Sequence, residues 1–323
     1  MNKKKILITG SNGLLGQKLV YTLLDRNDVE VIATSKGENR IREKQGYIYE
    51  SLDITLLPEV EAVFKKYRPH TVINTAAMTN VDACENNRKA CWALNVTAVE
   101  NIVKTLEKIE IENSTAQLLN YSSHLIHLST DFVFDGKAGP YKEDDLPNPL
   151  SYYGLSKHMS EKYVQASKLK NTIIRTIIVY GITDHMSRSN VVLWAKDALE
   201  KGQKINVVDD QFRSPTLAED LAEGCILAAM KEAIGIYHIS GKDIMSILEL
   251  VYAVADFYGL DKSLIKPIKS ATLNQAAKRP LRTGFILDKA IKELGYQPHS
   301  FKEGLEILRS QLKQMGNTNS NYA

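Results

Sequence analysis

Three side chains in the middle of the chain have the types and spacing needed to reduce a carbonyl group. Thr130 ends an apolar, strand-like run, and Tyr153 and Lys157 lie four residues apart at the start of a helix-like run, so both project from one helical face. A hydride that reaches a ketone carbon leaves negative charge on the oxygen, which a tyrosine can protonate. A nearby ammonium lowers the pKa of the phenol toward neutral pH, where general acid–base catalysis contributes roughly 10²- to 10⁴-fold. The Thr130 hydroxyl would donate a hydrogen bond to the same oxygen.

This interpretation depends on context, because Tyr-x-x-x-Lys alone is a weak signal. A second copy runs from Tyr258 to Lys262 and contains Gly259, which is expected to end a helix. No strand that ends in serine or threonine precedes this copy, and we interpret it as structural. For the first pair the alternative is two surface residues on an amphipathic helix. The upstream threonine and a glycine-rich turn near the N-terminus disfavour that alternative.

The glycine-rich turn links a short apolar run to an amphipathic helix. Gly10 allows the turn, Gly13 lets backbone N–H groups approach a pyrophosphate, and Gly16 lets helix and strand pack closely. The start of the helix offers the phosphates its positive dipole end and free donors. A purely structural turn is the alternative, but the strand–turn–helix context favours a dinucleotide. We expect the cofactor to contact the whole turn, which comprises Gly10, Ser11, Asn12, Gly13, Leu14, Leu15 and Gly16.

The end of the second predicted strand bears on the choice between NAD and NADP. An acidic residue there would hold the ribose 2′-hydroxyl of NAD, but this strand ends in Ser35 and Lys36, and Arg40 follows. A hydroxyl and two cations suit a 2′-phosphate, so these three residues favour NADP (NADPH). Glu38 lies in the same loop and keeps NAD as the alternative.

The elements that must position these groups alternate along the chain. From Gly10 to about Gly181 the pattern is typical of an α/β fold, a Rossmann-type doubly wound parallel sheet. Strands are predicted at 5–9, 30–34, 47–52, 71–74, 125–129 and 172–177. Helices are predicted at 16–24, 57–66, 88–107 and 152–166. The segment 109–123 reads as a long surface loop.

After Gly181 the regular alternation of strand-like and helix-like runs ends, and the remaining sequence predicts a smaller C-terminal substrate lobe that covers the cofactor. Further helices are expected at 191–201, 216–230, 247–257 and 301–315, and strands at 204–208 and 235–239. The predicted division is a dinucleotide-binding domain at 1–180, to which 216–240 returns, and a substrate-binding lobe at 181–215 and 241–315. The composition of 316–323 is that of a disordered tail.

Composition excludes several other classes of protein. A net charge of +3 over 323 residues gives no reason to expect a nucleic acid or a membrane surface as partner, and no apolar run approaches the ~20 residues of a membrane span. The first strand begins too early to leave room for a signal peptide. The three cysteines, Cys84, Cys91 and Cys225, lack metal-ligand spacing, so we expect reduced thiols in a cytoplasmic protein without zinc.

These stretches together resemble the dTDP-4-dehydrorhamnose reductase family of the extended short-chain dehydrogenase/reductase superfamily. The resemblance rests on Ser-Thr-Asp-Phe-Val-Phe at 129–134 and Tyr-Gly-Leu-Ser-Lys at 153–157, with support from 74–82, 209–216 and 278–280. It covers nearly the whole chain. It implies an NADPH-dependent reduction of the 4-keto group of a nucleotide-linked deoxysugar, most closely dTDP-4-dehydro-L-rhamnose.

The resemblance also implies a role for individual residues. Tyr153 would be the acid, Lys157 its tuner and a ribose ligand, and Thr130 the donor to the carbonyl. Residues that would line or support the cofactor site are Asp53, Ile54, Asn74, Ala76, Ala77 and Asn95. Residues that would contact the substrate are Met78, Asp131, Phe132, Gln211 and Arg279. Arg279 carries a cation that suits a diphosphate, although it could instead be a solvated loop arginine. The alternative for 74–77 is a strand end whose small residues serve packing alone.

Two positions depart from the family pattern. Phe132 stands where a tyrosine often follows Thr-Asp, and Ile178 stands where a tryptophan often lies near the sugar. Both leave the reductase chemistry intact and the exact sugar open. Some relatives hold magnesium at a dimer contact, and Glu219 could match one ligand, but the other positions do not align. We therefore assign no metal and leave a homodimer possible.

Two rival functions remain open. A sugar-nucleotide epimerase could use the same Thr130, Tyr153 and Lys157, whereas a 4,6-dehydratase needs Asp-Glu after the threonine and Asp131 is followed by Phe132. A non-catalytic regulatory subunit, like that of methionine adenosyltransferase, is the rival from another class. The complete catalytic set favours an enzyme over such a subunit.

Overall fold

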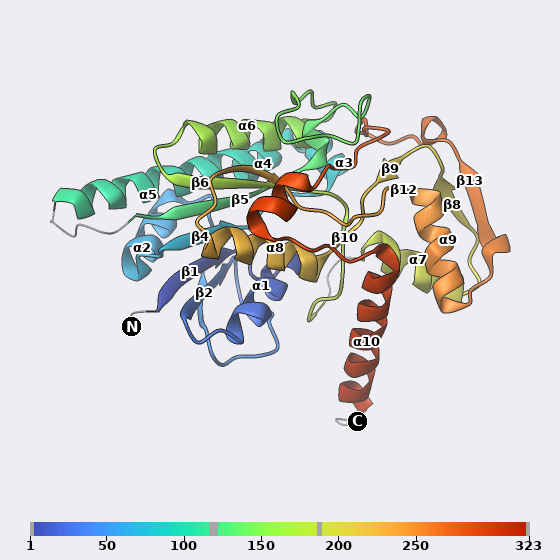
Figure 1. Ribbon diagram of the computed structural model, residues 1–323, viewed down its shortest axis with the longest axis horizontal. Helices are drawn as coiled ribbons and strands as arrows, with labels where there is room; N and C mark the ends of the chain where they lie inside the picture. Colours follow the sequence, from blue (N-terminus) through green and yellow to red (C-terminus); the bar gives the residue numbers. More distant parts are fainter. Residues whose placement is uncertain (1–2, 116–121, 186–188, 321–323) are drawn as a thin grey trace.

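A seven-stranded parallel sheet forms the centre of the protein in the computed structural model, which describes residues 3–115, 122–185 and 189–320. The strand order is β11-β6-β5-β4-β1-β2-β3, and every neighbouring pair is parallel. This confirms the expected Rossmann-type sheet (Figure 1). The strands are β1 (Lys4–Thr9), β2 (Val29–Ser35), β3 (Ile48–Ser51), β4 (Thr71–Asn74), β5 (His124–Thr130), β6 (Lys170–Thr176) and β11 (Gly235–His238).

Helices cover both faces of this sheet because successive strand residues point to opposite sides. Ile6 and Ile8 of β1 face one core, together with apolar residues of α1 and α8. Leu7 faces the other core, with residues of α2, α5 and α6. The helices are α1 (Leu14–Leu24), α2 (Leu57–Tyr67), α5 (Ala98–Thr115), α6 (Tyr152–Ala166) and α8 (Ala218–Met230).

A third core lies outside the sheet, in the C-terminal part of the chain. It is formed by α7 (Val191–Glu200), α9 (Ile247–Tyr258) and α10 (Phe301–Ser320), with short strand pairs beside them. The pairs are β8 (Ile205–Val208) with β13 (Ile265–Ile268), β9 (Phe212–Arg213) with β12 (Met245–Ser246), and β7 (Val179–Tyr180) with β10 (Thr216–Leu217). Single turns lie at Lys262–Leu264, Ser270–Thr272 and, as a π-helix, Ala290–Leu294.

Three expectations about helices need correction. The expected helix at 88–107 comprises α4 (Arg88–Trp92), a π-helix (Ala93–Thr97) and the first part of α5, and a separate short helix, α3 (Val81–Asn86), precedes it. The expected loop at 109–123 is helical as far as Thr115, because buried Ile109 and Asn113 continue the inner face of α5. Helix α10 continues through Ser320, five residues into the expected disordered tail. Residues 116–121 and 321–323 lie outside the described part of the chain.

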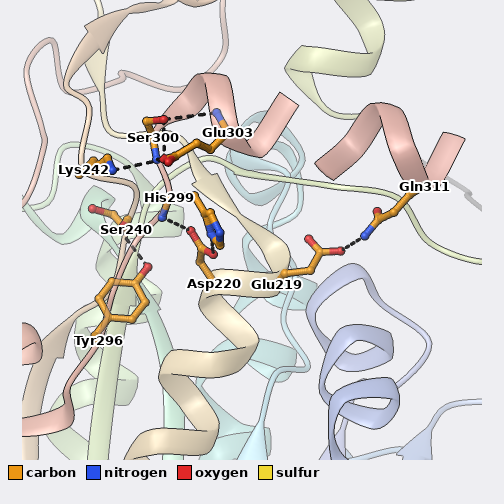
Figure 2. A network of polar contacts seen from close by, with 9 residues as sticks. All are labelled: Glu219, Asp220, Ser240, Lys242, Tyr296, His299, Ser300, Glu303 and Gln311. Carbon is orange, nitrogen blue, oxygen red and sulfur yellow. Dashed lines mark hydrogen bonds and ion pairs between the residues drawn. The ribbon is translucent and has the colours of Figure 1, made fainter. Parts of the chain in front are cut away.

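The C-terminal segment is tied to helix α8 by polar contacts (Figure 2). Asp220 accepts hydrogen bonds from the His299 backbone at 2.9 Å and pairs with its imidazole at 2.6 Å. Glu219 accepts a hydrogen bond from Gln311 of α10 at 2.6 Å. The same carboxylate pairs with Lys18 of α1 at 2.7 Å. Helix α8 therefore joins the first and the last helix of the protein.

Three structural findings bear on the classes of protein considered above. Within residues 3–115, 122–185 and 189–320, no helix is long and apolar enough to cross a membrane. Cys84, Cys91 and Cys225 are free and buried. Gly259 ends α9 in the left-handed conformation, φ 67°, which confirms that the second Tyr-x-x-x-Lys copy straddles a helix end.

Candidate active site

The glycine-rich turn places the start of α1 at the carboxyl edge of the sheet. Gly10 has a φ of +68°, and a Cβ there would lie 2.8 Å from the Ala76 nitrogen. A Cβ at Gly16 would lie 2.4 Å from the Gly10 carbonyl, so both positions need glycine. Helix α1 has no side-chain cap and no acidic residue in its first turn, and the buried Ser11 hydroxyl has no hydrogen-bond partner in the described structure. Unpaired donors at a helix N-terminus form an anion site.

The loop after β2 is held against this turn by Asn12 and Tyr49. Asn12 accepts a hydrogen bond from the Arg40 nitrogen at 2.8 Å and donates to the Glu38 carbonyl at 2.8 Å. The Tyr49 hydroxyl donates to the Gly37 carbonyl at 2.7 Å. Sequence reasoning missed Tyr49, which lies on a different strand and carries no local signal.

The cations that favour NADP lie on the exposed rim of this loop. Lys36 pairs with Asp53 at 2.8 Å, and its side chain is 81% exposed. Arg40 is also exposed, and Ser35 is half-buried at the end of β2. Ile54, by contrast, packs in the core, and its carbonyl accepts a hydrogen bond from Asn101 at 3.1 Å. Of the cofactor residues predicted in and beside this loop, Lys36 and Arg40 are thus exposed and charged, whereas Ile54 is buried in the core.

The three candidate catalytic residues meet where β5 ends and α6 begins. Thr130 is the last residue of β5, and its hydroxyl donates to the Asp131 carboxylate at 3.0 Å. The same hydroxyl acts to lower the pKa of the Tyr153 phenol. Ser151 caps α6 by accepting from the Gly154 nitrogen at 3.2 Å. A Cβ at Gly154 would lie 2.2 Å from the Phe132 carbonyl, so this glycine allows the helix to approach β5. The start of α6, which carries Tyr153, is therefore packed against the segment that follows Thr130.

The pKa of Tyr153 is shifted in the direction opposite to that expected. Burial raises the pKa of this phenol, and the Thr130 hydrogen bond only partly offsets the effect. Burial also lowers the pKa of Lys157 to about 8, against the opposing charges of Glu161 and Cys91. A raised pKa keeps the phenol protonated at neutral pH, which a proton donor needs. We expected Lys157 to lower the pKa of Tyr153, but burial has the larger effect and raises it.

A buried polar chain lies beneath Lys157. Its Nζ is 3.3 Å from His127 Nε2, which is 2.9 Å from the Ser160 hydroxyl. His127 Nδ1 lies 3.1 Å from the Asn74 amide nitrogen, and Asn74 accepts from the Thr9 hydroxyl at 2.6 Å. The Asn74 side chain, expected to line the cofactor, thus lies between two strands. His127 and Ser160 were missed, although a histidine inside an apolar strand is a signal that could have been noticed.

Asn95 joins three segments around the site. It accepts from the Met78 nitrogen at 2.8 Å, and its amide donates to the Met78 carbonyl at 3.0 Å and to the Ser156 hydroxyl at 3.0 Å. Asn95 lies in the π-helix at Ala93–Thr97, and such bulges are frequent at functional sites. The amide therefore fixes the segment after β4, which includes half-buried Ala76 and Ala77, against α6.

A fully buried ion pair supports α6 from the side of β6. Arg175 donates two hydrogen bonds to Glu161, at 2.9 and 2.8 Å, and both side chains are at most 2% exposed. Ser129 donates to the same carboxylate at 2.5 Å. These contacts hold the pKa of Glu161 down at about 2, against the effect of burial. The pair fixes the register of α6 against β5 and β6.

The predicted substrate residues Asp131 and Phe132 are part of a second buried cluster. Asp131 accepts from the Thr283 hydroxyl at 2.6 Å and lies 3.6 Å from the guanidinium of Arg213. Burial raises the pKa of this carboxyl despite these partners. The ring of Phe132 lies edge to face with that of Tyr153, with 5.7 Å between centroids. Arg213, which sequence alone left between ligand contact and loop support, donates to the Pro280 carbonyl at 2.6 Å.

Other predicted substrate residues lie around this cluster. Arg279 pairs with Asp82 at 2.6 Å, so its charge already has a partner. Gln211 is buried, and its carbonyl accepts from the Ile247 nitrogen at 2.9 Å. Ile178 has a φ of +31°, a region unusual for a β-branched residue, and such strain is found where surrounding structure imposes it.

Comparison with known proteins places this arrangement in a family. The model of the family described as RmlD substrate binding domain matches residues 4–314. The chain is similar to the spore coat polysaccharide biosynthesis protein SpsK of Bacillus subtilis strain 168, with 32% identity over 93% of this chain and 95% of that protein. It is also similar to a dTDP-4-dehydrorhamnose reductase of Aggregatibacter actinomycetemcomitans, with 30% identity over 95% and 98%. Similarity extends to methionine adenosyltransferase 2 subunit beta of Bos taurus, with 30% identity over 86% and 78%.

Solved structures agree with this placement. A dTDP-4-dehydrorhamnose reductase of Clostridium acetobutylicum has a TM-score of 0.80 at 29% identity, covering 96% of this chain and 99% of that one. One from Bacillus anthracis, solved in complex with NADP, has a TM-score of 0.80 at 26% identity with the same coverage. The fold and site thus define an extended short-chain dehydrogenase/reductase. Within that class the chain belongs to the dTDP-4-dehydrorhamnose reductase family of NAD(P)-dependent oxidoreductases.

Proposed function

We propose that this protein uses NADPH to reduce the 4-keto group of a nucleotide-linked deoxysugar. The substrate we propose is dTDP-4-dehydro-L-rhamnose, and its product is dTDP-L-rhamnose. The placement of Thr130 at the end of β5 and of Tyr153 and Lys157 one turn apart on α6 carries the proposal. The reductases among its relatives and the NADP complex of the Bacillus anthracis protein support it. We place the reaction in the cytoplasm, where buried thiols stay reduced.

The residues of the cofactor side fit a dinucleotide. The unpaired hydroxyl of Ser11 and the uncapped start of α1 suit a pyrophosphate. Lys36 and Arg40 suit a 2′-phosphate, for which we propose NADPH over NADH. In this chemistry the cofactor supplies the hydride. The protein must then bind and orient both ligands and supply one proton.

The proton and the polarising hydrogen bond come from the chain's own residues. Thr130 donates a hydrogen bond to the substrate carbonyl and so stabilises the charge that develops there. Tyr153, kept protonated by burial, transfers its proton to that oxygen. The ammonium of Lys157 favours the phenolate that remains. In the structure the Thr130 hydroxyl donates to Asp131 at 3.0 Å, and it turns toward the substrate oxygen when the sugar binds.

A spectroscopic assay tests this proposal directly. Loss of NADPH absorbance is followed with dTDP-4-dehydro-L-rhamnose and with a panel of other 4-ketosugar nucleotides. We predict turnover with the first compound and a loss of about 10²- to 10⁴-fold in kcat for Tyr153→Phe, with NADPH affinity unchanged. Near-full turnover of this variant would contradict the role of Tyr153.

The same assay separates the rival functions. Turnover with another ketosugar alone keeps the mechanism and changes the substrate. A cofactor that stays bound through purification, with interconversion of two sugars and no net oxidation, identifies an epimerase. If no sugar in the panel is reduced although the protein binds NADPH, a regulatory subunit is favoured, the function that the name of the Bos taurus relative indicates.

A further inference from the structure

His127 is a fully buried histidine in contact with Lys157, and the proposed reaction gives it no task. It lies on β5, three residues before Thr130, and is 0% exposed. Its ring contacts side chains from two elements: Asn74 at the end of β4, and Ser160 and Lys157 on α6. A buried polar ring with this many partners can be assigned one protonation state from their donors and acceptors.

The partners of His127 define its tautomer. The Asn74 carbonyl oxygen accepts from the Thr9 hydroxyl at 2.6 Å, so its amide nitrogen donates to His127 Nδ1 across 3.1 Å. Nδ1 is thus an acceptor, and the proton of the neutral ring lies on Nε2. The Ser160 hydroxyl gives its own proton to the Lys157 carbonyl at 2.7 Å, which leaves its oxygen to accept from Nε2 at 2.9 Å.

This tautomer affects what Lys157 can do. Its Nζ lies 3.3 Å from Nε2, a nitrogen whose proton points at Ser160 and which offers no lone pair. Among the residues that the structure describes, no other side-chain polar atom is in hydrogen-bond range of Nζ. Glu161 and Cys91 act on Lys157 only through their charges. All three N–H groups of the ammonium are therefore left for acceptors within the site.

We propose that His127, fixed as the Nε2–H tautomer by Asn74 and Ser160, is a positioning residue for Lys157. It packs against the Lys157 ammonium without accepting a hydrogen bond from it, so the ammonium donates to acceptors within the site. This inference rests on the proposed function, in which Lys157 is a ribose ligand and the partner of Tyr153. Burial and the nearby cation of Lys157 hold the pKa of His127 well below its usual range, while Glu161 acts in the opposite direction. The ring is therefore neutral at physiological pH.

The tautomer can be measured without any substrate. Nitrogen-15 chemical shifts of the imidazole, assigned by comparison with His127→Gln, distinguish the two neutral tautomers and the charged ring. We predict a neutral ring with its proton on Nε2 between about pH 6 and 8. A proton on Nδ1, or a ring that becomes charged in this range, would overturn the inference.

Two variants of equal shape test the consequence for Lys157. In His127→Gln the Asn74 amide selects the glutamine oxygen as its acceptor, which leaves an N–H donor toward Ser160 and Lys157. In His127→Glu an anionic acceptor replaces that donor and draws the ammonium inward. We predict NADPH affinity and kcat within about threefold of wild type for the first, and a loss of about tenfold or more in both for the second.

NADPH binding, followed by fluorescence titration, keeps this test separate from the proposed function. If no ketosugar is turned over but the two variants still differ in NADPH affinity, only the proposed function fails. If both variants bind NADPH equally well or equally poorly, His127 has no positioning role. Thermal unfolding shows that each variant is folded, and where His127→Glu does not fold, the tautomer measurement and His127→Gln decide the question.

Discussion

The proposed catalytic side and the proposed substrate side of the site are built in different ways. On the catalytic side, Thr130, Tyr153 and Lys157 lie on two long adjacent elements and are separated by fewer than about thirty residues of chain. On the substrate side, Asp131 meets Arg213 and Thr283, which come from distant parts of the sequence and from strands only two residues long or from loops. One side is positioned by regular backbone geometry, and the other by individual side chains.

This difference has a practical consequence for function. A substitution on the substrate side should change sugar binding without changing the cofactor site, because Arg213 donates to backbone carbonyls of the loop at 280–281. A substitution in the buried layer beneath the catalytic side should instead affect the whole fold, since that layer joins β4, β5, β6 and α6. Four predictions test this contrast, beginning with the largest expected effect.

Acid should destabilise the sheet before it affects the C-terminal lobe. His124, His127 and His238 are buried in β5 and β11, and burial lowers the pKa of each, to about 4 for His124 and about 3 for His238. The unfolded rings bind protons below about pH 6.5 and the folded rings do not, so stability present above that pH is lost as the pH falls. We predict a loss of several kcal/mol in the free energy of unfolding between about pH 7 and 5.

Denaturant unfolding at a series of pH values measures this slope. His238→Gln should reduce it, since one proton-binding difference is removed. An equal slope in wild type and His238→Gln would show that the buried rings are not its source.

Breaking the buried ion pair between Glu161 and Arg175 should lower the free energy of unfolding by nearly as much. Glu161→Gln leaves the cation of Arg175 buried without its counter-charge, so we predict a loss of about 3–5 kcal/mol in the free energy of unfolding. The matched control is Asp197→Asn, whose exposed pair with Lys201 should be worth at most about 0.5 kcal/mol. Denaturant titration at neutral pH gives both values, and similar losses would remove the contrast between buried and exposed pairs.

On the substrate side, Arg213→Met should weaken sugar binding selectively. The loop at 280–281 loses its donor and Asp131 loses its cation, so we predict a KM for the sugar nucleotide about tenfold higher. NADPH affinity should stay within about twofold of wild type. Arg282→Met is the control, because that exposed guanidinium lies over the ring of Phe212, where such contacts are worth about 0.5–1 kcal/mol. A parallel loss of NADPH binding would show that the two sides are not independent.

The smallest effect should be on the exposed rim of the cofactor side. Lys36→Ala combined with Arg40→Ala removes two solvent-exposed cations, so we predict NADPH binding weaker by several-fold to about tenfold. NADH, which lacks the 2′-phosphate, should bind as in wild type. Titration of both cofactors at two salt concentrations checks this, and equal losses for both would exclude these residues from a 2′-phosphate site.

The regular elements were predictable because their signals are local. Helix α6 has its expected bounds, since Ser151 provides a cap and the helical spacing follows. Strands β9 and β12 were not predictable, because two residues show no periodicity. Helix α5 was read as too short because Glu110 and Glu112 on its outer face resemble a loop, whereas Ile109 and Asn113 on the inner face are buried.

The candidate site was predictable to the extent that its residues are functional groups in a recognisable context. The positions of Thr130 at a strand end and of Tyr153 at a helix start were predictable from the pattern. The partners of Lys157 did not follow, since His127 and Ser160 owe their roles to packing between elements. The direction of the Tyr153 pKa was wrong for the same reason, because sequence does not show how deeply a phenol is buried.

The tie between Glu219, Lys18 and Gln311 has a consequence for how the protein is made. Helix α1, which begins at the glycine-rich turn, emerges early from the ribosome, but it packs in one core with the later helix α8 and pairs with it through Lys18 and Glu219. The part of this sheet face that α8 covers therefore stays open to solvent until most of the chain has been translated. During that interval the exposed apolar surface is a target for chaperones and for aggregation, and a chain truncated before α8 could not close it.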